Sequence, residues 1–409
     1  MTSQRKLWRG DLPGFVSRRG FLALAGSLVL PSRAVDIAHF PPSDMFRGNH
    51  LRTGFYETAD VGDDARVEML VRGKESIVAS PLLVEDLVCF GYCTVRSLLP
   101  TRKQPHRFVA VDKRTGRERW GFEAEKDIVS SAAYYDDTIL VGGLDGGLYA
   151  RDLDGHPKWR FQAEGGIFTS PAVYDGHAYF ASGDMEFGRL YCLDIKSRRL
   201  RWPPVPMLAG PFASPCVAGG NVFLGTYWNP RKQGFFYVVD AHTGEPRKEV
   251  RLPPQICHCS TPASDGETVY CVDCGEWERP SVFWAWDARA AEEKWQLELD
   301  ADNVASSIAL AGHLAIFGCD KGHLFAVNTR TQRLEWKSSY NAGAYHGSPC
   351  VTPRRVYIGS MCSTLDVFDH HGNHLKAYEV GGNIESTPVA RDAQLFFGCN
   401  DGGLYRLTA

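Results

Sequence analysis

The chain lacks the features that identify several common protein classes. No long stretch shows the helical repeat of apolar residues, which excludes a predominantly helical fold. The 45 Lys and Arg residues are outnumbered by 48 Asp and Glu, and the formal net charge of −3 gives no reason to expect nucleic acid as a partner. No Ser/His/Asp set or phosphate-binding glycine loop stands out, because the glycine-rich pieces recur at regular intervals as hairpin turns.

A repeated unit accounts for most of the sequence. After Ser170-Pro171, an alternating apolar run at 172–180 is followed by an aromatic-containing run at 190–194 and by Trp202. Eight dipeptides begin such units, and their second residues lie 39 to 51 positions apart: Ser80-Pro81, Ser131-Ala132, Ser170-Pro171, Ser214-Pro215, Thr261-Pro262, Ser307-Ile308, Ser348-Pro349 and Thr387-Pro388. A period of about 40–45 residues with four short strands is typical of propeller blades. The eight dipeptides, called anchors below, therefore predict eight blades.

We predict an all-β fold, an eight-bladed β-propeller closed by an N-terminal strand that pairs with the last blade. Runs of β-branched and aromatic residues bounded by Gly and Asp indicate the strands. The last unit stops at Leu407 after its third strand, so a strand at 67–72 would supply the fourth and remove both exposed sheet edges. The predicted organisation is a signal peptide at 1–34, an irregular lead-in at 35–65 and a single propeller at 66–409.

Tryptophan recurs where the fourth strand of a unit is expected. Five units carry it: Trp120, Trp159, Trp202, Trp295 and Trp336. A buried Trp covers about 150–250 Å². We therefore expect these side chains to pack between neighbouring blades rather than to contact a ligand.

The N-terminus has the parts of a twin-arginine export signal in the expected order. Basic residues precede Arg18-Arg19, an apolar run of about ten residues follows, and Ser32-Arg33-Ala34 supplies a cleavage site. That run is too short to span a bilayer, so we expect no transmembrane span in the mature chain. The alternative is a chance Arg-Arg before a buried strand. The signal predicts export by the twin-arginine route to the periplasm or beyond.

The repeat resembles the PQQ-type (quinoprotein-like) β-propeller superfamily. The pattern Ser-Pro-x-Val, then Gly-x-Leu-Tyr-Ala-x-Asp, then a Trp carries the resemblance over about residues 66–407, and the opening segment Met45-Phe46-Arg47-Gly48-Asn49 with Thr53-Gly54 is also similar. The superfamily includes quinoprotein dehydrogenases, a propeller lipoprotein that assists outer-membrane protein assembly, and propellers attached to adenylating enzymes. The chain departs from the dehydrogenases because it is shorter and has no two consecutive Cys. Bound pyrroloquinoline quinone (PQQ) is therefore disfavoured.

Long connections between second and third strands provide one candidate site. They are expected at 92–107, 226–235 and 273–281, on one face of the ring, where loops on a rigid scaffold carry function. Trp next to Arg is typical of binding hot spots, and these connections hold Arg102 and Lys103 and the predicted partner-binding residues Trp228, Arg231, Lys232, Trp277 and Arg279. The alternative is a solvated loop whose Trp folds back onto its own blade.

A second candidate site comes from aligning the anchors. Cys257 and Cys259 are two apart in a strand and should share a face, with His258 opposed. His346 falls at the Cys259 level two blades further on, which requires a narrow channel mouth. Cys257, Cys259 and His346 would suit copper or zinc. A dry channel lined by Cys and partial oxidation are the competing interpretations.

The remaining cysteines and the overall function complete the sequence-based expectations. Local disulfides are conceivable at Cys271/Cys274 and Cys89/Cys93 in an exported protein. Four others should be buried apolar residues: Cys216, Cys319, Cys350 and Cys399. Without a catalytic set, the sequence favours a non-catalytic exported scaffold that binds a protein or peptide of the cell envelope. The alternative is a quinoprotein-like or metal-dependent oxidoreductase, or a metal-binding protein, with its site at the channel mouth.

Overall fold

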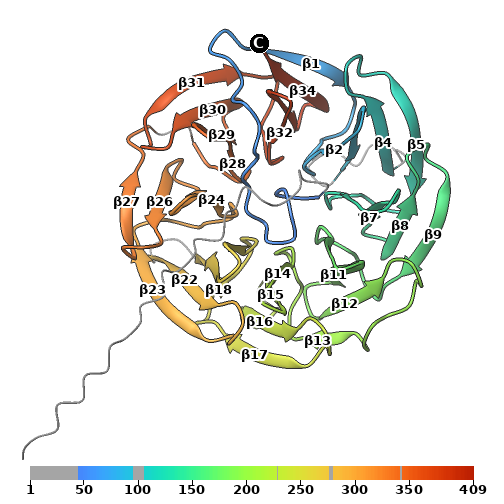
Figure 1. The fold of residues 1–409 in the computed structure, drawn as a ribbon, viewed down its shortest axis with the longest axis vertical. Helices are drawn as coiled ribbons and strands as arrows, with labels where there is room; N and C mark the ends of the chain where they lie inside the picture. The colour runs from blue at the N-terminus through green and yellow to red at the C-terminus, as the bar shows by residue number, and fades with distance from the viewer. Residues whose placement is uncertain (1–44, 95–105, 228, 276–279, 341–342) are drawn as a thin grey trace, which may run out of the picture. The chain divides into compact units, whose positions relative to one another are not determined.

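The computed structural model describes residues 45–94, 106–227, 229–275, 280–340 and 343–409. In this part of the chain every regular element is a strand, and eight four-stranded antiparallel sheets form a ring (Figure 1). The predicted all-β, eight-bladed propeller is confirmed. The described residues contain no helix with the length and apolarity needed to cross a membrane.

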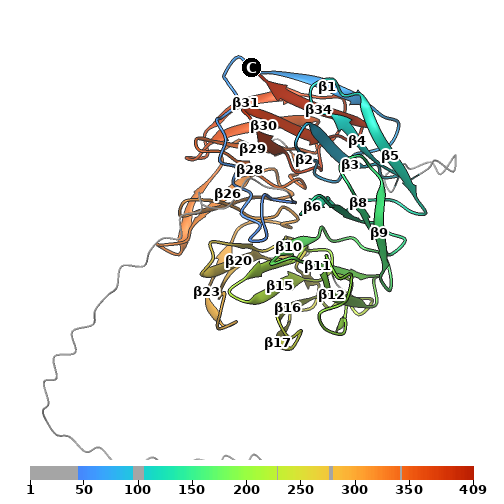
Figure 2. The ribbon, with the colours of Figure 1, turned by 45° about the vertical axis from the view of Figure 1, so that its right-hand side comes forward.

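The blades follow one another along the chain, and within each the strands run from the centre of the ring outward (Figures 1 and 2). Blade one consists of β2 (Leu82–Val84), β3 (Leu87–Gly91), β4 (His106–Asp112) and β5 (Glu118–Ala124), and blade two of β6 (Ala133–Tyr134), β7 (Ile139–Gly142), β8 (Gly147–Arg151) and β9 (Pro157–Gln162). Blade three consists of β10 (Ala172–Tyr174), β11 (His177–Gly183), β12 (Gly188–Asp194) and β13 (Val205–Met207), and blade four of β14 (Cys216–Ala218), β15 (Asn221–Gly225), β16 (Phe235–Asp240) and β17 (Pro246–Arg251).

The other four blades complete the ring. Blade five consists of β19 (Ala263–Ser264), β20 (Thr268–Val272), β22 (Ser281–Asp287) and β23 (Glu293–Leu299), and blade six of β24 (Ala309–Ala311), β25 (Leu314–Gly318), β26 (Leu324–Asn328) and β27 (Arg333–Lys337). Blade seven consists of β28 (Cys350–Val351), β29 (Arg355–Gly359), β30 (Thr364–Asp369) and β31 (His374–Glu379), and blade eight of β32 (Val389–Arg391), β33 (Gln394–Gly398) and β34 (Gly403–Thr408) with β1 (Arg66–Arg72). A short additional pair, β18 (Ile256–Cys257) with β21 (Cys274–Gly275), belongs to blade five.

The anchor hydroxyls explain why Ser or Thr begins each unit. The backbone N–H of each anchor donates to the hydroxyl of the next anchor at 2.9–3.3 Å, and the eighth donates to the first, so that eight hydrogen bonds form a closed cycle. The members in order are Ser80, Ser131, Ser170, Ser214, Thr261, Ser307, Ser348 and Thr387. All eight side chains are buried. The cycle satisfies donors that would otherwise be unpaired in the interior.

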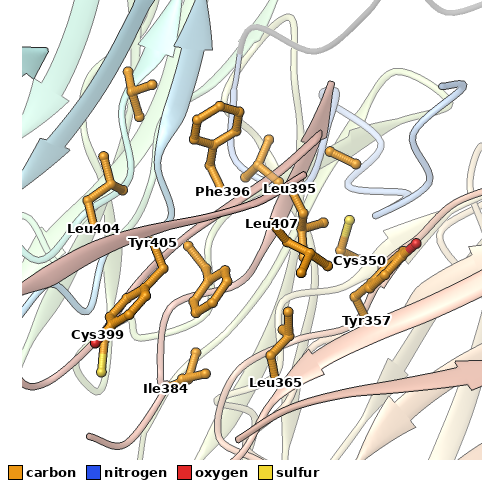
Figure 3. Close-up of a cluster of buried hydrophobic side chains, with 14 of the residues drawn as sticks. Cys350, Tyr357, Leu365, Ile384, Leu395, Phe396, Cys399, Leu404, Tyr405 and Leu407 are labelled. Carbon is orange, nitrogen blue, oxygen red and sulfur yellow. The ribbon is translucent and has the colours of Figure 1, made fainter. Parts of the chain in front are cut away.

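The ring closes between the two ends of the propeller. β1 pairs antiparallel with β34, with Val67 opposite Leu407 and Glu68 opposite Arg406, and Arg406 forms an ion pair with Glu68. The predicted closing strand is therefore confirmed. Behind it, one apolar cluster joins the last blade to its neighbours, and its members include Phe396 and Leu395 of the last blade and Tyr357 of blade seven (Figure 3).

The outer tryptophans join adjacent blades as expected. Trp120, Trp202 and Trp336 donate their indole N–H to carbonyls of the next blade's outer turn, at Leu153, Ala241 and His370. A glycine in each of these turns has positive φ, and a β-carbon there would lie within 3 Å of the indole ring: Gly155, Gly244 and Gly372. The glycine therefore serves both the turn and the close approach of the ring.

The described part of the lead-in, from residue 45 onward, fills part of the centre of the ring, where Figures 1 and 2 show it in blue. Its carbonyls accept backbone N–H groups from the first strands of blades four to seven, at Val217, Ser264, Leu310 and Val351. Two arginines in it are fully buried. Arg52 donates to the carbonyls of Ser170, Pro215 and Phe46, and Arg47 donates to those of Ile308 and Pro349. The segment thereby connects opposite sides of the propeller.

Candidate functional site

One rim of the ring is built from the same pair of positions in every blade. Within each blade, a residue in the segment that leads into the first strand pairs with a residue at the end of the second strand or just after it. Examples are the bridges Ser76/Cys93, Gly166/Gly183 and Cys257/Cys274. Equivalent backbone bonds of 2.9 Å join Leu144 to Asp127, Tyr227 to Gly210, Met361 to Ala344 and Asn400 to Asn383. We call this edge the loop rim.

Blade five places three thiols together on the loop rim. Cys257 and Cys259 approach the first strand, Cys274 follows the second, and their sulfur atoms all lie within 4.8 Å of one another. The Sγ atoms of Cys257 and Cys259 are 3.5 Å apart, which is a non-bonded distance. All twelve cysteines are free thiols in the structure. Cys257 and Cys274 are buried, whereas Cys259 is partly exposed.

His258 points away from the thiols, as the strand alternation predicts. Its Nδ1 lies 3.0 Å from the carbonyl oxygen of Val272, and its ring packs between Phe236 and Trp284. Burial lowers the pKa of His258 to about 4, so the ring is neutral at pH 7. This histidine belongs to the contact between blades four and five.

His346 lies at the end of a polar chain that starts at the thiols. Cys274 Sγ is 2.6 Å from Asn303 Oδ1, and Asn303 in turn donates its amide to Asp320. Asp320 Oδ1 is 3.2 Å from His346 Nε2. The structure therefore brings Cys257 and Cys259 together with Cys274, and it connects His346 to them through two intervening side chains.

Hydrogen bonds among the three thiols of this cluster shift their pKa values. Bonds from the Cys259 and Cys274 thiols lower the pKa of Cys257 to about 5, and the same sharing raises the pKa of Cys259 and Cys274. Burial raises the pKa of the neighbouring Asp273 to about 7. The lowered pKa favours Cys257 as the first of the three to lose its proton, and a thiolate is the form that binds metals.

Blades three and four place aromatic side chains on the same rim. Phe168 and Phe212 stack with ring centroids 5.0 Å apart, and Tyr227 lies 5.2 Å from Phe212. Phe212 is 39% exposed, and two further apolar residues in connections of blade three are also exposed, Leu208 after β13 at 50% and Met185 between β11 and β12 at 44%. Apolar patches of this kind mark binding surfaces on soluble domains.

Two of the five predicted partner-binding residues fall within the described chain. Arg231 and Lys232 are exposed in the connection between β15 and β16. Asn229 shapes this turn, because its Oδ1 accepts the N–H of Arg231 at 3.0 Å and its Nδ2 donates to the carbonyl of Leu208. The other predicted residues, Trp228, Trp277 and Arg279, and also Arg102 and Lys103, lie outside the described residues.

The sequence contained a signal for Cys274 that the alignment of anchors alone misses. That alignment compares only the positions before the first strand of each blade, whereas the residue after the second strand pairs with those positions. Aligning both positions places Cys274 opposite Cys257 and Asp320 beside Asn303. The aromatic cluster lies at equivalent positions of the repeat, since Phe168 and Phe212 stand in blades three and four where Cys259 stands in blade five.

Comparisons with known proteins agree with this architecture. The sequence matches the family described as "Outer membrane protein assembly factor BamB" over residues 106–226 and 187–409. No curated protein matches the sequence significantly.

Three solved structures with similar folds share 13–14% sequence identity with the chain. BamB from Moraxella catarrhalis has a TM-score of 0.65, with 84% of this chain and 100% of that chain covered, at 13% identity. The quinohemoprotein alcohol dehydrogenase from Comamonas testosteroni has a TM-score of 0.68 with 90% and 80% covered, at 13% identity. The computationally designed Ika8 protein has a TM-score of 0.66 with 83% and 98% covered, at 14% identity. Because the family match covers more than half of the sequence, the chain belongs to the BamB-type family of PQQ-repeat β-propellers.

Proposed function

We propose that the chain is an exported, non-catalytic β-propeller that binds a protein or peptide of the cell envelope through the loop rim of blades three and four. The observation that carries this proposal is the cluster of Phe168, Phe212 and Tyr227, which stays solvent-accessible at 39% for Phe212. Aromatic residues contribute much of the binding energy at protein interfaces when they are stacked and held rigid.

The surroundings of the cluster suit a protein partner. Arg231 and Lys232 project from the adjacent turn, and Arg beside aromatic residues is the usual composition of an interface hot spot. The turn is fixed by Asn229 and by the bond from Gln255 N–H to the carbonyl of Lys232 at 2.8 Å. A surface that is already ordered loses little conformational entropy on binding.

The envelope setting rests on two independent supports. The N-terminal Arg18-Arg19 pattern is that of a twin-arginine signal. The matched family is described as an outer membrane protein assembly factor. Both favour a partner that the folded propeller meets after export.

The experiment is affinity capture from envelope extract of the native host with the exported chain as bait. We expect Phe212→Ala combined with Arg231→Ala to lower recovery of the main envelope partner at least tenfold. The matched control is Tyr135→Ala, which removes an exposed aromatic residue from the turn between β6 and β7, outside the loop rim. Equal recovery with both variants, or a partner whose capture needs Tyr135, would disprove the proposed surface.

The alternative function is an oxidoreductase with a site at the centre of the loop rim. A quinone is the less favoured cofactor, because PQQ carries three carboxylates that call for cationic partners. Among the described residues, the positions that approach the first strands at this rim include the acidic Asp127 and Glu385, and Asp320 lies beside them. The cluster of Cys257, Cys259 and Cys274 is the one observation at this rim that favours a bound cofactor, and it favours a metal rather than a quinone. An absorption spectrum of protein exported by its own host tests for a quinone.

A further inference from the structure

We propose that Cys257, Cys259 and Cys274 form a binding site for one thiophilic d¹⁰ cation, copper(I) or zinc(II). The site is independent of the partner-binding surface, because it lies in blade five and uses none of the aromatic residues of blades three and four. It also differs from the set expected from the sequence, since Cys274 replaces His346 as the third ligand.

The spacing of the sulfur atoms matches a shared ion. At a metal–sulfur distance of about 2.3 Å, two thiolates on one ion are about 3.8–4.0 Å apart. The three sulfurs all lie within 4.8 Å of one another, and the pair Cys257/Cys259 is separated by 3.5 Å. Small side-chain rotations therefore place all three at bonding distance without moving the backbone.

The backbone holds these thiols in place. Cys257 and Cys274 are direct partners in the short pair β18–β21, which supplements the four-stranded sheet of blade five. Cys259 is two residues from Cys257 and shares its face, whereas His258 is turned to the opposite side. In the described part of the chain, no other group of Cys, His, Asp or Glu brings three candidate ligand atoms together in this way.

The surroundings are those of a ligand site rather than of a dry core. Cys259 is partly exposed, which gives an ion access. Asn303 contacts the Cys274 sulfur at 2.6 Å and donates to Asp320, which pairs with His346. Outer-shell hydrogen bonds of this kind orient metal ligands and tune their basicity. The other buried cysteines, such as Cys216 and Cys350, lie within apolar clusters and belong to no group of three candidate ligands.

The chemistry of three sulfur ligands selects the cation. Thiolates are soft ligands that favour copper(I) and zinc over calcium or magnesium. Zinc usually takes four ligands, so a three-sulfur site would need water as a fourth, whereas copper(I) is satisfied by three thiolates. Binding releases the thiol protons and occupies the sulfur atoms that a disulfide would join, so it competes with disulfide formation in an oxidising compartment.

The test is a metal titration of the reduced full chain under anaerobic conditions. Copper(I) and zinc(II) are added separately in competition with a chromophoric chelator, and sulfur-to-metal charge transfer is recorded. We expect one equivalent of one of the two ions to bind, and Cys274→Ser to weaken that binding at least 100-fold. Cys362→Ser, which removes an exposed thiol outside the group, is the matched control and should bind as the unmodified chain does.

Two further variants and one measurement separate the alternatives. His346→Ala should keep the affinity within about threefold, and a loss equal to that of Cys274→Ser would overturn the three-sulfur ligand set. Binding of neither ion, or unchanged binding by Cys274→Ser, would also overturn the proposal. Circular dichroism of Cys274→Ser confirms that any loss is not a loss of fold. Finally, a thiol count that falls by two on air exposure regardless of added metal would assign the group to a disulfide instead.

Discussion

At the scale of single residues, aspartates at the ends of the third strands hold the outer turns together. Asp240 is representative, because its Oδ1 accepts the backbone N–H groups of His242 and Thr243 at 2.9 Å and its Oδ2 pairs with Arg247 at 2.5 Å. Partial burial alone would raise the pKa of Asp240, but the bonds from Arg247 and the two backbone groups outweigh it and lower the pKa to about 2. The pKa values of the corresponding residues Asp194, Asp287 and Asp369 are also lowered.

The lowered pKa of Asp240 leads to a prediction for acid stability. An unfolded Asp has a pKa near 3.9, so the folded carboxylate contributes stability that is present above about pH 4 and is lost as the pH falls towards 2. Asp240→Asn keeps the turn acceptor and removes the charge. We expect it to lower the free energy of unfolding at pH 7 by under about 1 kcal/mol, after screening by solvent.

Thermal melts of Asp240→Asn and the unmodified chain between pH 7 and pH 3 measure this effect. The difference in melting temperature should shrink as the pH falls. Glu245→Gln, in the exposed part of the same turn, serves as the control and should show no such trend. A difference that grows towards pH 3 would contradict the assigned role.

At the same scale, the two buried arginines of the lead-in show what a local reading of sequence cannot supply. Arg52 and Arg47 reach carbonyls up to 163 and 302 residues away, and burial lowers their pKa values to about 9 and about 10. Both remain charged at pH 7, stabilised by carbonyl oxygens. The sequence indicated only an irregular lead-in, because the acceptors come from four different blades and leave no local pattern.

At the scale of the blade, the anchor was the most informative part of the sequence. A Ser or Thr at fixed offset from each first strand predicted the number of blades, and the closed hydroxyl cycle gives the physical reason for that recurrence. The site was only half predictable. Strand alternation placed Cys257 with Cys259, whereas Cys274 becomes visible only when the return of the second strand to the rim is considered.

The hydroxyl cycle predicts which substitutions the anchor residues tolerate. Ser170 accepts the buried N–H of Ser131 at 2.9 Å, so Ser170→Ala should leave that donor unpaired and cost about 1–3 kcal/mol of the free energy of unfolding. Ser170→Thr keeps the hydroxyl and should cost much less, because Thr261 and Thr387 occupy the same position in two other blades. Chemical denaturation of both variants measures the difference. An Ala variant as stable as the Thr variant would show that the cycle adds nothing.

At the scale of the whole molecule, two features close the ring in different ways. The pairing of β1 with β34 joins the first and last blades through a sheet edge. The segment 45–56 joins blades four to seven through the centre, using backbone bonds from Val217, Ser264, Leu310 and Val351 together with the two arginines. The first removes exposed strand edges, and the second resists separation of blades that are not adjacent.

These two closures can be separated by N-terminal truncation. A chain of residues 45–409 keeps both closures and is expected to melt like the full chain. A chain of residues 66–409 keeps β1 but loses the central segment, so it should remain a monomeric propeller with a lower melting temperature. A chain of residues 73–409 also loses β1, which leaves β34 as an exposed edge strand beside the apolar cluster of Phe396 and Tyr357. Because unpaired edges recruit other chains, this last variant should form oligomers or aggregate in size-exclusion chromatography. If the 73–409 chain were instead monomeric and melted at the same temperature as the 66–409 chain, pairing between the ends would not be what keeps the ring closed.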